Sequence, residues 1–248
     1  MSCAQTVTSF KPPVFTKSIL IIVGGYGSGK SEVSVNLARY LVTHLSPPEP
    51  VSIADLDIVN PYFRSREASV ELEKLGIRAI TPKGAHFFAD LPIIVPEIKG
   101  AVEEHAGKVI LDVGGDDVGA RVLSSLADAF ERGTYDLLLV LNANRPFTST
   151  IEGCIKIIQE IEDASRLCFT GIISNTHLLE YTSSETVLSG LDFSREVSAS
   201  ADLPISFVSA TAQVLKLIDP KLIDVPVLPL HRSLLKPWEH KDADRQDT

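Results

Sequence analysis

The sequence has little cysteine, an excess of acidic over basic residues and no long apolar run, and each shortage excludes a class of protein. The three cysteines are far apart and odd in number, so they form neither a disulfide framework nor a metal-binding spacing, which favours a cytoplasmic location. The net charge of −9 at pH 7 argues against nonspecific DNA binding. No stretch approaches the roughly 20 apolar residues that span a bilayer, and the start MSCAQTVTSFKPPVF lacks the pattern of a secretion signal.

What is present is an alternation of apolar runs and helical patterns from residue 18 onward. The expected strands are residues 18–24, 51–55, 77–81, 108–113, 136–142, 168–174 and 204–209. The clearest expected helices are residues 31–45, 64–75, 118–132 and 149–166. The strands are continuously apolar, as in a sheet covered on both faces. The alternation predicts an α/β fold with a mainly parallel sheet and helices on both faces.

The 248 residues are enough for one domain with a sizeable core. We expect a single domain over residues 18–235, preceded by an extension of residues 1–17. The charged segment 236–248 is expected to be a tail.

The strongest motif is GGYGSGKS, between the first expected strand and the first helix. It satisfies the pattern GxxxxGK[ST], in which glycines let main-chain N–H groups point at a phosphate. Lys30 is expected to reach the β- and γ-phosphates, and the Ser31 hydroxyl to bind Mg²⁺. The predicted nucleotide-binding residues of this loop are Gly24, Gly25, Tyr26, Gly27, Ser28, Gly29, Lys30 and Ser31. The alternative is an ordinary glycine-rich turn.

A phosphate loop needs carboxylates for its metal. Asp112 ends the apolar run VILD, where a Walker B carboxylate holds Mg²⁺ directly or through water. Asp112 and Gly115 also fit the pattern D-x-x-G, in which the glycine N–H senses the γ-phosphate. The alternative for Asp112 is a solvated residue at a strand end. Asp116 and Asp117 are better explained as turn or helix-cap residues.

Asp55 and Asp57 form a second acidic pair at the end of the second expected strand. An extended backbone directs side chains two residues apart to one side, and the carboxyl ends of parallel strands face the ligand. One carboxylate is expected to position the attacking water and the other to approach the metal. The alternative is a turn before Asn60 and Pro61.

Arg64 and Arg66 follow this pair. Either could stabilise charge at the γ-phosphate or hold an anionic substrate, although a solvated helix start explains them more simply. Tyr62 and Phe63 are interpreted as core or interface residues rather than as residues that stack on a base.

The sequence lacks the N-K-x-D stretch that gives many GTPases their guanine specificity. The corresponding strand end reads IISNTH, where Asn175 could bond an adenine edge or belong to a turn. ATP is therefore preferred over GTP. Asn142 and Arg145, in LNANRP, line the same crevice or serve the turn.

The order of GGYGSGKS, ADLDIVNP, ILDVGGDD and ISNTH resembles the SIMIBI class of P-loop NTPases, and within it the CobQ/CobB/MinD/ParA group, over about residues 18–210. The resemblance implies a three-layer P-loop NTPase fold, Mg²⁺ and ATP as ligands, and often a nucleotide-sandwich homodimer. It implies phosphate and metal roles for Lys30 and Ser31, water activation by Asp57, and a place for Asp112 in the outer metal shell.

One position departs from this resemblance. MinD and ParA proteins carry an additional lysine early in the loop, where this sequence has Gly25. The departure weakens a role in partitioning or septum positioning, and the segment KPWEHKDADRQDT has no apolar face for a membrane.

Three functions remain open. The first is a slow regulatory or assembly ATPase that hydrolyses the β–γ bond and acts on an unidentified protein partner. The second is an ATP-dependent ligase or transferase that activates a small carboxylic acid, as the dethiobiotin synthetase and cobyrinate amidase members do, with Arg64 or Arg66 holding the acid. A nucleotide-dependent DNA- or membrane-associated module ranks last because of the net charge and the C-terminal segment.

Overall fold

The computed structural model describes residues 9–57, 69–80, 96, 98–103, 107–131 and 133–232. Its strands are β1 (Ile19–Gly24), β2 (Val51–Asp55), β3 (Ile77–Ile80), β4 (Lys108–Gly114), β5 (Tyr135–Leu141), β6 (Gly171–Ser174), β7 (Ile205–Thr211) and β8 (Val227–Leu230). Its helices are α1 (Lys30–His44), α2 (Ser69–Lys74), α4 (Asp117–Leu126), α5 (Ile151–Ser165), α6 (Ser184–Ala201) and α7 (Ala212–Leu215). All described strand pairs are parallel, in the order β3-β2-β4-β1-β5-β6-β7-β8.

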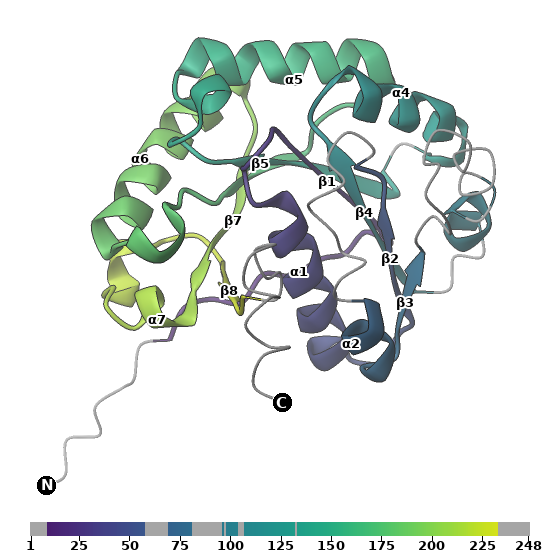
Figure 1. Cartoon of the computed structure of the whole chain (residues 1–248), viewed down its shortest axis with the longest axis horizontal. Helices are drawn as coiled ribbons and strands as arrows, with labels where there is room; N and C mark the ends of the chain where they lie inside the picture. Colours follow the sequence, from purple (N-terminus) through teal and green to yellow (C-terminus); the bar gives the residue numbers. More distant parts are fainter. Residues whose placement is uncertain are drawn as a thin grey trace, which may run out of the picture.

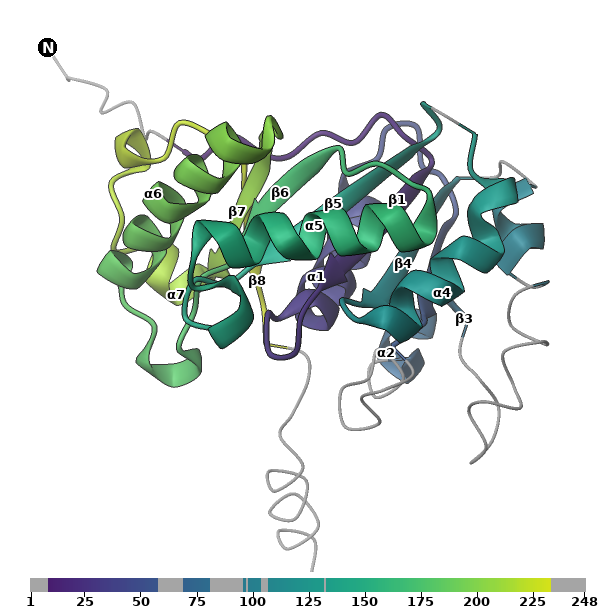
Figure 2. The ribbon, with the colours of Figure 1, turned by 90° about the horizontal axis from the view of Figure 1, so that it is seen from above.

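The central strand β1 is buried on both faces, and this explains its continuous apolar sequence (Figures 1 and 2). Ile21 and Val23 pack into the core beneath α4 and α5, whereas Leu20 and Ile22 pack beneath α1. Successive strand side chains point to opposite faces, so only an uninterrupted apolar run fills both cores. The predicted three-layer α/β fold with a parallel sheet is confirmed.

The strand order places the carboxyl ends of β2 and β4 on one side of β1, and those of β5 and β6 on the other. Because parallel strands all end at the same sheet edge, the loops that follow these five strands meet there. Ligands of open α/β sheets bind at this edge. The fold therefore brings the predicted motifs into one region.

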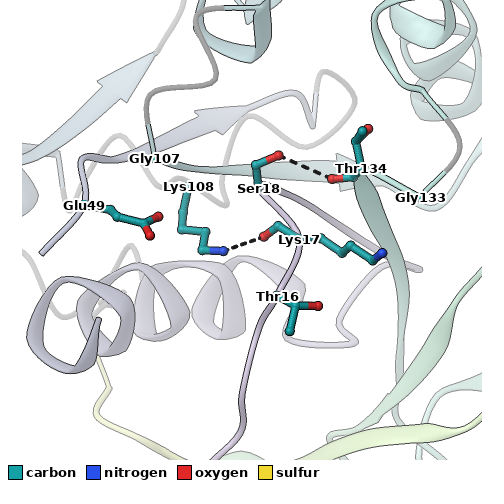
Figure 3. A pocket seen from close by; sticks show the side chains of 8 residues that line it. All are labelled: Thr16, Lys17, Ser18, Glu49, Gly107, Lys108, Gly133 and Thr134. Atoms are coloured by element: carbon teal, nitrogen blue, oxygen red, sulfur yellow. Dashed lines mark hydrogen bonds between the residues drawn. The ribbon is translucent and has the colours of Figure 1, made fainter. Parts of the chain in front are cut away.

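The N-terminal segment 9–17 lies at the other end of the sheet, where the strands begin. The Val227 N–H donates to the Lys11 carbonyl (2.8 Å), and the Tyr40 hydroxyl donates to the Pro13 carbonyl (2.9 Å). A hollow of about 570 Å³ lies at the starts of β1, β4 and β5 (Figure 3). It is lined by Thr16, Lys17, Ser18, Glu49, Gly107, Lys108, Gly133 and Thr134. It lies at the end of the sheet away from the phosphate loop.

Several predicted features lie outside the described residues. They are Asn60, Pro61, Tyr62, Phe63, Arg64, Arg66 and the tail 236–248. In the part of the chain that the structure describes, no helix is long and apolar enough to cross a membrane.

Candidate functional site

The predicted phosphate loop connects β1 to α1 and leaves the start of α1 open. Gly29 is the N-cap residue of α1 and has a left-handed backbone, with φ of 86°, so no side chain caps the helix. The first N–H groups of a helix have no partner within it, and the helix dipole makes this end favourable for an anion. An uncapped helix start after a glycine-rich turn is the arrangement that a phosphate requires.

Two side chains from other strands hold the loop in this conformation. The Asn175 amide, after β6, donates to the Ser28 carbonyl (2.7 Å), and Arg145 Nε, after β5, donates to the Gly27 carbonyl (2.7 Å). Ser209 in β7 donates its hydroxyl to Asn175 Oδ1 (2.9 Å), which fixes the amide orientation. These bonds fix the loop to β5, β6 and β7.

The carboxylates lie on the other side of the loop. Asp55 and Asp112 are direct neighbours in the paired strands β2 and β4. Leu56 N–H donates to the Asp112 carbonyl (2.8 Å), and Asp57 N–H donates to Asp55 Oδ1 (3.2 Å). The predicted acidic residues therefore converge beside Lys30.

Lys30 Nζ forms an ion pair with Asp57 Oδ2 at 2.6 Å, and both side chains are about 5% exposed or less. Burial lowers the pKa of Lys30, but the charges of Asp112, Asp57 and Asp55 outweigh burial and raise it above its ordinary value. Lys30 is therefore a positively charged group held among three carboxylates. We expect this charge to pass to a phosphate when one is bound.

Asp112 is fully buried, and its pKa is raised to about 6. Burial is the main cause, opposed by the charge of Lys30. Neither carboxylate oxygen has a well-formed hydrogen bond among the described residues, although the Ser31 and Ser34 hydroxyls lie near enough to lower the pKa. The Ser31 hydroxyl is also buried without such a partner.

These unsatisfied oxygens fit a magnesium ion. Mg²⁺ prefers oxygen ligands, keeps several waters and shares the phosphates of its nucleotide. No group of three or more His, Cys, Asp or Glu converges on a metal position in the described ranges. A hydroxyl with one or two carboxylates, completed by phosphate and water, is the donor set that the site offers.

The remaining predicted residues take distinct places. Tyr26 is 80% exposed at the tip of the loop. The Gly115 N–H donates to the Gly24 carbonyl (3.1 Å), so contact with a γ-phosphate would require this bond to break. Asp116 is the N-cap of α4 and accepts from Val118 and Gly119 N–H, which confirms its interpretation as a cap.

The sequence alone indicates no role for Ser209 or His177. His177 lies beside the loop, where a side chain on Gly29 would come within 3.1 Å of its Nε2. Its pKa is lowered to about 4 by burial and by the charge of Arg145. Its position at the end of β6, in ISNTH, was the available signal; Ser209 had none beyond lying in an expected strand.

No protein-family model and no curated protein matches the sequence. Cell division protein FtsY from Thermotoga maritima aligns with a TM-score of 0.51 and 21% identity, over 88% of this chain and 70% of its own. Signal recognition particle 54 kDa protein from Aeropyrum pernix K1, in complex with GDP, gives 0.52 and 19%, over 79% and 42%. FlhF complexed with GMPPNP and Mg²⁺ gives 0.51 and 17%, over 80% and 67%. This chain has their fold.

The likeness confirms the expected three-layer α/β fold of P-loop NTPases, while membership of the SIMIBI class stays a prediction. It does not extend to the narrower CobQ/CobB/MinD/ParA group, which stays a prediction. The chain spans 59% to 70% of the FtsY chains that it matches and 42% of the 54 kDa protein. Activities and partners of those longer proteins are therefore not assigned to this chain.

Proposed function

We propose that the protein is a Mg²⁺-dependent P-loop ATPase that hydrolyses the β–γ bond slowly and serves a regulatory or assembly role. The observation that carries the proposal is the combination of a charged Lys30 at an uncapped helix start with the unsatisfied oxygens of Ser31 and Asp112. An uncapped start alone suits many anions. The added lysine and metal donor set suit a triphosphate with its magnesium.

Each charged or hydroxyl side chain of the site has its own role in this proposal. Lys30 exchanges the Asp57 carboxylate for phosphate oxygens when a triphosphate enters. Asp57, released from Lys30, then lies beside the terminal phosphate and orients the attacking water. Ser31 and Asp112 would hold Mg²⁺, with Asp55 near the same shell, and the bound ion would supply charge neutralisation at the phosphates.

ATP is preferred because the sequence lacks N-K-x-D. The Asn175 amide bonds Ser28 and its oxygen accepts from Ser209, so a contact to adenine would use its second N–H. GTP is the second candidate, supported by the guanine nucleotides bound to two proteins of the same fold. A homodimer or another protein partner is proposed on the resemblance alone and is checked by light scattering with and without nucleotide.

Titration calorimetry with ATP, GTP and CTP, each with Mg²⁺ and with EDTA, tests the proposal. We expect binding of ATP that weakens without Mg²⁺, and phosphate release without an added substrate. Phosphate release only after a carboxylic acid is supplied would favour the ligase alternative instead.

A Ser31→Ala variant should lose the Mg²⁺ dependence of binding. Ser194→Ala is the matched control, because Ser194 is equally buried but lies in α6 and bonds Ser174 and the Gly190 carbonyl. A wild-type protein that binds none of the three nucleotides would refute the proposed function.

A further inference from the structure

The two sides of the phosphate loop differ in charge, and this orients a bound nucleotide. On the β4 and β2 side lie Asp112, Asp55 and Asp57, where the metal and the terminal phosphate belong. On the β5 and β6 side lie Arg145 and His177, and no ion pair with a carboxylate is formed there by either residue in the described part of the chain. A nucleotide whose phosphate tail points to the first side must extend its sugar and base over the second.

The Arg145 side chain is fixed on that second side. Its Nε donates to the Gly27 carbonyl, and a side chain on Gly27 would come within 2.9 Å of the same nitrogen. Gly27 has φ of 73°, a backbone that glycine adopts without strain. The missing Cβ therefore lets the guanidinium approach the loop closely.

The backbone of Arg145 is held as firmly as its side chain. Arg145 N–H donates to the Asn142 carbonyl (3.1 Å), and Thr148 N–H donates to the Arg145 carbonyl (3.0 Å). The Thr148 hydroxyl donates to the Asn142 carbonyl at 2.7 Å. Few conformations remain open to this arginine, so a ligand that uses it loses little conformational entropy on binding.

The charge of Arg145 is only partly satisfied. Nε has the Gly27 carbonyl, but no carboxylate pairs with the guanidinium among the described residues, and the side chain is half-buried. The charge of Arg145 acts on His177, which stays neutral at physiological pH because burial and Arg145 itself depress its pKa. The positive charge and the flat face of the guanidinium therefore remain available.

We propose that Arg145 is a nucleoside-side contact, whose guanidinium lies against the sugar and the face of the base of the bound nucleotide. A guanidinium stacks on any aromatic face, so it strengthens binding of purine nucleotides without selecting adenine or guanine. This inference rests on the proposed function, since it requires that a nucleotide occupies the loop.

The test compares ligands that share the phosphate tail but differ in the nucleoside. Calorimetry is run with Mg-ATP, Mg-GTP and Mg-tripolyphosphate on wild type and Arg145→Gln. We expect both nucleotides to bind the variant about tenfold more weakly, the loss typical of a partly desolvated cation–π contact. Tripolyphosphate has no sugar or base and depends only on the loop that Arg145 braces, so it should lose clearly less affinity than the two nucleotides.

Arg166→Gln is the matched control. Arg166 is exposed and follows the C-terminal end of α5, whose 15 residues extend roughly 22 Å from the Arg145 turn. It should leave all three affinities unchanged. If Arg145→Gln folds poorly, Arg145→Lys replaces it; it keeps the charge but not the flat face, and should also lose nucleotide affinity selectively.

NMR can distinguish a direct contact of Arg145 with the base from a merely structural role of this residue. The side-chain protons of Arg145 should shift upfield with Mg-ATP, because of the ring current of the base, and not with tripolyphosphate. Equal losses for nucleotides and tripolyphosphate would overturn the inference in favour of loop bracing alone, and so would unchanged affinity for ATP. A wild-type protein that binds tripolyphosphate but no nucleotide would instead refute the proposed function.

Discussion

Two lysines are buried at opposite ends of the same sheet, and their partners differ. Lys30, at the carboxyl end, is 4% exposed and pairs with a carboxylate. Lys108, at the amino end, is 6% exposed and donates to the carbonyls of Phe15 (3.1 Å) and Lys17 (2.8 Å), the second of which Figure 3 shows. Burial of a lysine is therefore common to both ends, and the groups around it distinguish them.

The difference separates a structural role from a chemical one. The Lys108 ammonium satisfies two main-chain carbonyls and so ties the N-terminal segment to β4. Lys30 lies among three carboxylates, beside the buried oxygens of Ser31 and Asp112, which have no well-formed hydrogen bond in the described residues. Because unsatisfied buried polar groups are costly, their concentration at one end favours a ligand there. The hollow at the other end is lined by no such group among the described residues.

Replacement of Lys30 should have the largest effect on nucleotide binding. Lys30→Met removes the ammonium that the phosphates need, and we expect Mg-ATP affinity to fall at least about 100-fold, or roughly 3 kcal/mol. Calorimetry measures this. The single change also leaves Asp57 buried without its partner, which is destabilising.

The double variant Lys30→Met/Asp57→Asn removes both charges of the pair and should recover much of the lost stability without recovering binding. Urea unfolding separates the two effects. Tight Mg-ATP binding by either variant would show that Lys30 has no more chemical role than Lys108.

Asp112→Asn should raise the stability of the nucleotide-free protein and weaken nucleotide binding. The Asp112 carboxyl has a pKa near 6 when folded against about 4 when unfolded, so the folded protein binds its proton more tightly. Its contribution to stability therefore falls as pH rises from about 4 to 6 and stays low above that. At pH 8 we expect the amide to stabilise the nucleotide-free protein by roughly 3 kcal/mol, while Mg²⁺-dependent binding is lost.

Urea unfolding of this variant and of wild type at pH 4 and pH 8 checks the sign. The advantage of the variant should shrink at pH 4, where the folded carboxyl is protonated and the unfolded one is about half protonated. A variant less stable than wild type at pH 8 would mean that Asp112 is needed as a counter-charge for Lys30 in the free protein.

Lys108→Met should have the opposite profile to Lys30→Met. It leaves the Phe15 and Lys17 carbonyls without their donor, which costs roughly 1–3 kcal/mol of unfolding free energy. Affinity for Mg-ATP should stay unchanged, because the site lies at the other end of the sheet. If the fully folded variant still lost affinity, the structural role of Lys108 would not be separate from nucleotide binding at the carboxyl end of the sheet.

The sequence predicted the phosphate loop and Asp112 but not the side chains that brace the loop, for physical reasons. The loop GGYGSGKS and Asp112 were identifiable because phosphate chemistry demands particular residues at a fixed spacing. The contact of Arg145 with Gly27 joins positions 118 residues apart, and that of Asn175 with Ser28 joins positions 147 apart. No local pattern encodes such contacts, so the bracing of the loop became visible only in the structure.

Some described elements, among them α6 and β8, were not predicted from the sequence, for local reasons. The helix α6 buries a stripe that includes Gly190 and Ser194, which are small or polar, so its apolar periodicity is weak. The strand β8 has four residues and contains Pro229, which cannot donate a ladder hydrogen bond and fits only an edge. The long apolar strands of the sheet centre, by contrast, were predicted within a few residues.

His177 can be compared with Lys30, because it is a buried basic group at the same end of the sheet but on the side of the loop without carboxylates. Burial and Arg145 lower its pKa to about 4, below the ordinary 6.5. Folding therefore favours the neutral ring: the stability that this provides is complete above pH 6.5 and is lost as pH falls through about 4. The amount is roughly 3 kcal/mol.

The variant His177→Gln should remove this dependence while keeping a polar group beside Gly29. Urea unfolding between pH 7 and pH 4 should give a shallower loss of stability for the variant than for wild type, with parallel curves above pH 7. Identical slopes would mean that His177 is protonated as easily folded as unfolded. In that case a buried basic group beside the loop would keep its charge without a carboxylate partner, and the carboxylates around Lys30 would no longer explain why that lysine stays charged.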